Sequence, residues 1–334
     1  MSDDLQPLAP DEGVERFLRH REPSVRKSTL QNARTRLSAF LDWCEDREIE
    51  NLNELSGRDL SDFVAWRRSD VAAITLQKQL STIRVALRFW ADIEGVEDGL
   101  AEKVHAPELP DGAESRDVHL DASRAEAILS YLDRYQFASR RHAVMTLLWN
   151  TGMRRSALIS LDVDDMRPDE QALVLEHRIE QGTKLKNGEA GNRWVYLGPE
   201  AYQIVDEYVA ENRHNVTDEY GREPLITSKN GRPSGSSIYN WVHRATHPCE
   251  YGECPHDRDP VDCEAVGSEN TPSKCPSSRS PHAVRRGAIT EHLNDDVPPE
   301  TVSERMDVSL EVLYQHYDAR TAREKMEVRK KHLE

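Results

Sequence analysis

The sequence predicts a mainly helical protein with a small β-sheet, built as a helical N-terminal domain and a mixed α/β C-terminal domain. Three observations lead to this prediction. Apolar residues recur at helical intervals along most of the chain, only two short segments are strand candidates, and an aperiodic segment with two prolines and a glycine separates the two halves. The 334 residues are enough for two cores. We place the domains at residues 1–106 and 119–334, with a linker at 107–118.

Three helices are expected in the N-terminal domain. The first begins at Ser28, which has capping-box spacing to Gln31. The second spans residues 57–68. The third spans residues 74–93 and carries leucine, isoleucine and tryptophan on one face. Its other face is polar and includes Gln77, Lys78, Ser81 and Arg84.

The C-terminal domain is expected to be mainly helical, with two short strands between its second and third helices. Helical patterns cover residues 122–137 and 139–151, and strand candidates at 172–178 and 193–197 are joined by a polar turn. Pro199 opens a helix that continues to Asn212, since proline is favoured at the first helical position. Further helices are expected at 235–246, 282–294 and 309–316.

Charge and hydropathy restrict the class of protein. No stretch approaches the roughly 18 continuous apolar residues of a membrane span, and the acidic N-terminus does not resemble a signal peptide. We therefore expect a soluble, cytoplasmic protein. The net charge is −16, and 34 arginines accompany only 10 lysines. Abundant acid with scarce lysine is typical of proteins from a very salty cytoplasm, so we expect a halophilic archaeal source.

Five polar residues stand out by their order and spacing. Arg154 follows a helix that ends at a glycine, in Thr-Gly-Met-Arg. Lys186 lies in the turn between the two strand candidates. His282 and Arg285 form His-x-x-Arg, which places both side chains on one helical face. Tyr317 lies 32 residues beyond Arg285.

This ordered set resembles the signature of the tyrosine recombinase (phage integrase) family, and the resemblance covers residues 12–320. It implies a helical, SAM-like core-binding domain followed by the family's mixed α/β catalytic domain. It further implies cleavage and rejoining of duplex DNA through a 3′-phosphotyrosyl bond to Tyr317, with the hairpin lysine as the acid. Guanidinium groups suit phosphate oxygens, and His282 is a base or proton relay for the tyrosine. Neither ATP nor Mg²⁺ is implied, because the ester conserves the bond energy.

Two assignments remain open from the sequence. Lys184 competes with Lys186, which is preferred because it lies nearer the turn at Asn187-Gly188. Tyr314 competes with Tyr317, which the spacing from Arg285 favours.

The chain also departs from the family pattern in two places. Met306-Asp307-Val308-Ser309 replaces the usual Leu-Gly-His-Ser, so a phosphate contact is either missing or supplied by Arg286 or His316. Ala157 replaces an acid.

The resemblance also implies the partners. Duplex DNA is expected to be held by both domains, with four protomers assembled on two sites. The basic tail at residues 320–331 is a candidate for docking on a neighbouring protomer. Local positive charge guides proteins to phosphate backbones even when the net charge is negative. The N-terminal candidates for DNA contact are Lys27, Gln77, Lys78, Ser81 and Arg84.

A cysteine-rich insertion at residues 247–280 precedes His282. It contains Cys249, Cys254, Cys263 and Cys275, and it is too polar to fold by apolar burial alone. A structural four-cysteine zinc site is favoured over disulfides, an iron–sulfur centre or unligated thiols, because reducing compartments favour metal. Cys44 is expected in the core.

Two alternative functions belong to other classes. One is a noncatalytic DNA-binding protein with a zinc module. The other is a zinc-dependent hydrolase, against which a closed shell of four thiolates argues, since it leaves no position for water.

Overall fold

The computed structural model describes residues 5–25, 27–108, 118–267, 271–318 and 320–330. The chain divides into two compact units, residues 1–116 and 117–334. Most of the predicted linker, residues 109–117, lies outside the described residues. Among those described, no helix is both long and apolar enough to cross a membrane.

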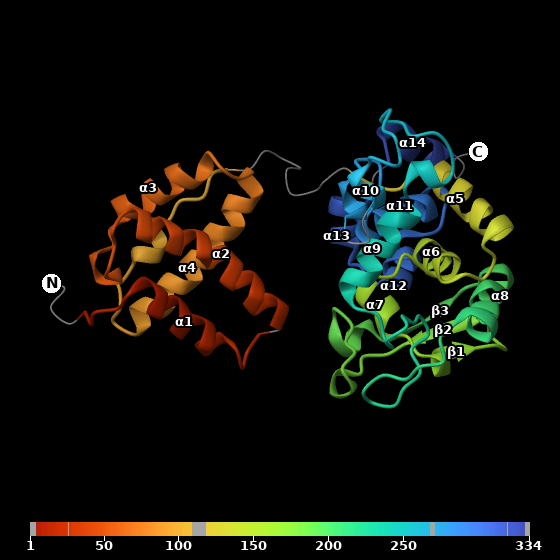
Figure 1. Cartoon of the computed structure of the whole chain (residues 1–334), viewed down its shortest axis with the longest axis horizontal. Helices are drawn as coiled ribbons and strands as arrows, with labels where there is room; N and C mark the ends of the chain where they lie inside the picture. Colours follow the sequence, from red (N-terminus) through yellow and green to blue (C-terminus); the bar gives the residue numbers. More distant parts are fainter. Residues whose placement is uncertain (1–4, 26, 109–117, 268–270, 319, 331–334) are drawn as a thin grey trace. The chain divides into compact units, whose positions relative to one another are not determined.

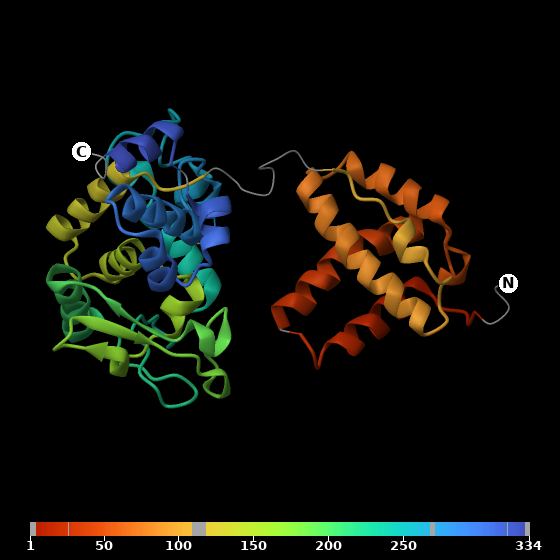
Figure 2. The same cartoon turned by 180° about the vertical axis from the view of Figure 1, so that it is seen from behind.

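The N-terminal unit is a cluster of helices (Figures 1 and 2), and its core contains several aromatic side chains. The helices are α1 (Pro10–Arg21), α2 (Lys27–Asp46), α3 (Gly57–Arg68) and α4 (Ala73–Asp92). The rings of Phe40, Trp43, Phe63 and Trp90 pack against one another in its core. Cys44 is buried as expected, and burial raises the pKa of its thiol to about 12.

Local capping explains where these helices begin. Ser56 and Asp59 form a reciprocal capping box that starts α3. The expected box at Ser28 is wrong, because α2 already begins at Lys27. Helix α1 was not predicted; its apolar residues Val14, Phe17 and Leu18 become a buried stripe only when α2 and α4 cover them.

The C-terminal unit contains a three-stranded antiparallel sheet, which confirms the predicted fold class. The strands are β1 (Met166–Arg167), β2 (Ala172–Leu175) and β3 (Arg193–Tyr196), in that spatial order. In the β2–β3 pair, Leu173 lies opposite Val195. Both predicted strands end earlier than expected. The connection between them is a folded loop of residues 176–192 rather than a simple turn.

Helices surround α6 and α11 at the centre of this unit (Figure 1). The larger ones are α5 (Ala122–Tyr135), α6 (Arg140–Thr151), α7 (Arg155–Ser160), α8 (Pro199–Glu207), α9 (Gly235–Ala245), α11 (Pro281–Asn294), α12 (Pro299–Met306) and α14 (Ala322–Lys330). The segment predicted at 309–316 is α13 (Leu310–Val312), which continues as a π-helical turn, Leu313–Tyr317. Helix α10 (Glu264–Gly267) belongs to the cysteine-rich insertion.

A backbone crossing holds α11 against the start of the unit. The Leu120 N–H donates to the Ala283 carbonyl over 3.1 Å. A Cβ added at Gly287 would lie 2.0 Å from the Leu120 carbonyl oxygen, so only glycine fits there. This contact fixes the helix that carries the His-x-x-Arg motif.

Candidate active site

Arg154 is positioned by the glycine that ends α6. Gly152 has a left-handed backbone (φ 56°) and caps the helix, as the sequence indicated. A Cβ there would lie 2.4 Å from the Met306 sulfur. Arg154 follows as the N-cap residue of α7. The turn therefore brings the arginine next to the C-terminal end of α12.

Arg285 is buried at the centre of the site. Its side chain is 1% exposed, and Nη1 donates to the carbonyls of Gly152 (2.6 Å) and Met306 (2.7 Å). Nε and Nη2 have no hydrogen-bond partner among the described residues. Burial and the charge of Arg154 lower the pKa of Arg285 to about 10, so the group is still charged at neutral pH. Two buried donors on a cation are suited to an anion.

Tyr317 lies beside both residues of the His-x-x-Arg motif. Its side chain is 8% exposed, and its ring centre lies 5.1 Å from Cζ of Arg285 and 5.3 Å from the His282 ring centre. Thr290 of α11 donates to the Tyr317 carbonyl over 3.2 Å. The alternative tyrosine, Tyr314, is 52% exposed and has no such contacts among the described residues. The structure therefore brings Tyr317, not Tyr314, to Arg285 and His282.

The pKa of His282 is lowered by burial and by the positive charges around it. Its side chain retains solvent exposure, yet partial desolvation and the charge of Arg285 lower its pKa. Smaller contributions come from Arg286, Lys186 and Arg154. The imidazole is consequently neutral near pH 7, the form that can accept a proton.

The loop between β2 and β3 places Lys186 within electrostatic range of His282. Lys186 is exposed, whereas Lys184 is half-buried. At the base of this loop Arg178 pairs with Asp162 (3.3 Å) and with Asp165. Asp162 is itself buried and also accepts from Arg222 over 3.2 Å. This network anchors the loop to the body of the unit.

Asp307 and Val308 show what replaces the usual motif. Asp307 caps α12 in the left-handed conformation (φ 55°). Its carboxylate accepts from Arg154 over 2.5 Å and from Asn187 over 2.7 Å. Val308 is 4% exposed and packs with Tyr317 in an apolar cluster, so its side chain offers no hydrogen bond. Arg286, one suggested substitute for that contact, is buried on α11.

Sequence reasoning missed two contributors to this site. Arg193 of β3 donates from Nε to the Arg305 carbonyl over 2.9 Å, and burial lowers its pKa to about 10. Asn187 contacts Asp307 from the loop. Asp307 itself was noted in the sequence at the position of the usual glycine, and an aspartate tolerates the left-handed conformation found there. Arg193 gave no signal in the sequence.

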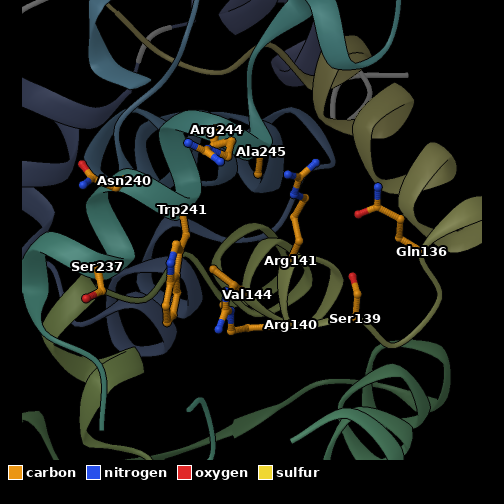
Figure 3. A pocket seen from close by; sticks show the side chains of 10 residues that line it. All are labelled: Gln136, Ser139, Arg140, Arg141, Val144, Ser237, Asn240, Trp241, Arg244 and Ala245. Atoms are coloured by element: carbon orange, nitrogen blue, oxygen red, sulfur yellow. The ribbon is translucent and has the colours of Figure 1, made fainter. Parts of the chain in front are cut away.

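A hollow of about 440 Å³ lies against this cluster, between the loop and α12. Arg193, Asp307 and Val308 are among the residues that line it. A second hollow, of about 500 Å³, lies elsewhere, between the N-terminal end of α6 and α9 (Figure 3). There Arg140 stacks 3.9 Å from the Trp241 ring centre. Because α6 rises roughly 1.5 Å per residue, this second hollow lies about a helix length away from the Gly152 end.

The cysteine-rich insertion packs beside α9 and leads directly into α11. Nδ1 of His243 forms a hydrogen bond with the Ser278 hydroxyl over 2.7 Å. Nε2 of His247 donates a hydrogen bond to the Pro272 carbonyl, also over 2.7 Å. One small cavity is lined by all four cysteines of the insertion, together with two histidines. The cysteines are Cys249, Cys254, Cys263 and Cys275.

The predicted metal site is not assembled in the structure. In the described part of the chain, no three His, Cys, Asp or Glu side chains are arranged to hold a metal ion, and no cysteine forms a disulfide. The physical reason is that metal binding and folding of the site are coupled. Thiolates repel one another, and the free energy of metal binding is what brings the four side chains together. Burial and the neighbouring thiols of Cys254 and Cys275 raise the pKa of Cys249.

The N-terminal candidates for DNA contact differ in their availability. Lys27, Lys78 and Ser81 are exposed and Gln77 is half-buried, on α2 and α4. The Arg84 guanidinium instead donates to the Val104 carbonyl over 3.0 and 2.8 Å. Arg84 therefore also has a structural role in its own unit.

Comparison with known proteins matches both units to one family. Residues 14–92 match the phage integrase N-terminal SAM-like domain, and residues 119–257 match the phage integrase family. The chain thus contains regions similar to both of these phage integrase domains. The second match ends within the cysteine-rich insertion, before the His-x-x-Arg helix and Tyr317.

Curated tyrosine recombinases share modest sequence identity with this chain. Tyrosine recombinase XerD of Mycobacterium leprae is 29% identical over 212 residues, a match that covers 58% of this chain and 62% of that protein. XerD of Vibrio cholerae is 24% identical over 246 residues, covering 72% and 76%. The matched region thus spans less than two thirds of the M. leprae protein.

Two solved structures are similar in fold. The Tn1549 transposon integrase in complex with a circular intermediate DNA has a TM-score of 0.70 and 14% identity, covering 98% of this chain and 100% of that one. A lambda integrase dimer bound to a COC′ core site has a TM-score of 0.66 and 12% identity, covering 94% and 78%. At these identities the likeness shows the fold alone.

Proposed function

We propose that the protein is a site-specific DNA recombinase that cleaves and rejoins duplex DNA through Tyr317. The observation that carries the proposal is the buried Arg285, whose Nε and Nη2 have no partner among the described residues and whose Cζ lies 5.1 Å from the Tyr317 ring centre. A phosphodiester would satisfy those donors and would lie beside the hydroxyl that attacks it. The relatives named recombinases and the DNA-bound structural neighbours are consistent with this substrate.

The reaction divides among the residues by their chemistry. Arg154 and Arg285 hold the nonbridging phosphate oxygens and offset the charge that develops in the transition state. The Tyr317 oxygen attacks phosphorus while neutral His282 takes its proton, and the DNA 5′-oxygen departs with a proton from Lys186. The product is a 3′-phosphotyrosyl ester. Because this ester is as easily reversed as it is formed, rejoining requires neither ATP nor Mg²⁺.

The proposed assembly, by resemblance to the family, is a homotetramer that holds two DNA sites together. Within it, the DNA strands of the two sites are exchanged one pair at a time. The exposed Lys27, Lys78 and Ser81, with the half-buried Gln77, supply N-terminal contacts to the phosphate backbone. Arg84 contributes less to this surface, because it is bonded to Val104. A single recombinase site bound by two protomers is the smallest unit of this assembly.

The test is covalent trapping on supercoiled DNA that carries the gene's own flanking sequence, in molar KCl. After denaturation, protein attached to DNA 3′ ends is measured for wild type, Tyr317→Phe and Tyr314→Phe. The exposed Tyr314 is the matched control, since both variants lose one hydroxyl. We expect the adduct to disappear only with Tyr317→Phe. DNA binding without any adduct would instead favour the noncatalytic DNA-binding protein.

We further propose that the insertion binds one structural zinc ion through its four cysteines. The shared cavity and the reduced state of the thiols support this, although the described residues are not arranged as a metal site without the ion. Four thiolates close the coordination shell, so the ion would act in folding and not in catalysis.

A high-salt cytoplasm is the proposed setting of the protein. Its support is the net charge of −16 together with the excess of arginine over lysine. At molar salt the Debye length falls to roughly 3 Å, which removes most of the repulsion between surface carboxylates.

A further inference from the structure

Asp307 presents a carboxylate where this site would receive its phosphate. Helix α12 ends at Met306, and Asp307 follows with φ 55°. Arg285 donates to the carbonyl of Met306, the residue immediately before it. The carboxylate is thus held by the same turn of chain that Arg285 uses, and its side chain is only 13% exposed.

The contacts of this carboxylate link two parts of the site. One oxygen accepts from Nη1 of Arg154 over 2.5 Å, in a largely buried ion pair. The other accepts from the side-chain amide of Asn187 over 2.7 Å. Asn187 is the neighbour of Lys186, so a single side chain connects the first arginine with the loop that carries the lysine.

We propose that Asp307 is an internal anion that occupies Arg154 and restrains the Lys186 loop until a DNA phosphate replaces it. This inference rests on the proposed strand-cleavage function. A carboxylate and a phosphodiester each bear one negative charge and offer acceptor oxygens to the same guanidinium, so they compete for it. Displacement would release Asn187 at the same moment, which frees the loop to bring Lys186 to the bound phosphate.

Local electrostatics explain why such an anion is useful in the free protein. Burial is the main cause of the lowered pKa values of Arg193 and Arg285, and the nearby charge of Arg154 lowers both further. Asp307 is the acid that opposes this effect at Arg193. Uncompensated cations at partly buried positions are costly, so an internal counterion stabilises the empty site and must be exchanged for the substrate.

The first experiment measures the Arg154 contact without catalysis. The full chain is treated with the arginine reagent phenylglyoxal, and modification of Arg154 is followed by peptide mass spectrometry. Asp307→Asn and Asp307→Gly remove the charge while tolerating the left-handed backbone. The control is Asp257→Asn, an exposed residue in the insertion with φ 49° and the same change in net charge.

We expect Arg154 to react about tenfold faster in both Asp307 variants, which corresponds to loss of one charge-assisted contact. Its rate should be unchanged in Asp257→Asn. Inorganic phosphate should protect Arg154 at lower concentration in the Asp307 variants than in wild type. Equal reactivity and equal protection in wild type and variants would overturn the proposal.

The second experiment separates competition from positioning. Formation of the Tyr317 adduct is measured against DNA concentration. Asp307→Asn should lower the half-saturating DNA concentration by about fivefold beyond any effect of Asp257→Asn, without lowering the maximal rate. A maximal rate reduced about tenfold would mean that Asp307 positions Arg154 for the reaction, and the proposal would be rejected. If no protein forms an adduct, the proposed function fails, while the Arg154 reactivity still decides the role of Asp307.

Discussion

At the scale of single residues, the site depends on conformations that few residue types adopt. Gly152 and Asp307 both have positive φ, and both lie where separate helices converge on Arg285. Glycine at the first position leaves room for Met306, whose sulfur fills the space of the missing Cβ. Aspartate at the second position adds a carboxylate that glycine could not supply. The left-handed backbone conformation is thus adopted by a glycine at position 152 and by a charged residue at position 307.

Gly152→Ala should therefore lower the free energy of unfolding of the 117–334 unit by about 2–4 kcal/mol. Roughly 1 kcal/mol comes from the left-handed backbone and the rest from crowding against Met306. Calorimetry of the full chain measures the change in the corresponding transition. Gly221→Ala is the matched control, since Gly221 also has positive φ (74°) but nothing within 4 Å of its added Cβ. Equal losses in the two variants would show that Met306 moves aside without cost.

At the scale of elements, the insertion supports the helix that carries His282. Its last residues lead into Ser280, which caps α11 by accepting from the Ala283 N–H. His243 of α9 bonds to Ser278, two residues earlier, and burial lowers its pKa to about 4. Arg279 donates to the His119 carbonyl over 2.9 Å. Order in the insertion is therefore transmitted to the start of α11.

Zinc removal should destabilise this part of the chain. Protein purified under reducing conditions is expected to contain about one zinc per chain by elemental analysis, and a chelator should lower its melting temperature by several degrees, because the ion binds only the folded insertion. Cys263→Ser should abolish the metal content. Cys44→Ala, which removes a buried thiol of the N-terminal unit, should leave it unchanged. Metal-free protein with the same melting temperature as the untreated sample would contradict the proposal.

At the scale of the whole molecule, the net charge of −16 is expected to make stability depend on salt. Sixty acidic residues face 44 basic ones, and many ion pairs are on the surface, such as Arg34–Glu15 and Lys103–Glu97. Exposed pairs of this kind contribute little, about 0–1 kcal/mol each. At low salt, repulsion among the excess carboxylates is therefore expected to outweigh what these exposed pairs contribute.

Raising KCl from 0.1 M to 2 M should increase the melting temperature. The physical reason is that added salt screens the repulsion among exposed carboxylates, whereas the largely buried ion pairs around Asp162 and Asp218 are screened much less. Scanning calorimetry at fixed pH provides the measurement, and NaCl at equal concentration is the control for an effect of ionic strength alone. A melting temperature that falls steadily with KCl would argue against adaptation to a salty cytoplasm.

The sequence by itself determined the fold class and most helices, because amphipathic periodicity and helix-ending glycines are local signals. It also indicated the chemical residues, since Arg154, His282, Arg285 and Tyr317 have a characteristic order and spacing. Their roles remain proposals. Only the tertiary structure decided which tyrosine lies beside Arg285, that Arg193 and Asn187 join the site, and that Asp307 pairs with Arg154. The contacts of Arg193, Asn187 and Asp307 connect residues more than a hundred positions apart. No periodicity or local spacing records which distant side chains the packing of the core will bring together.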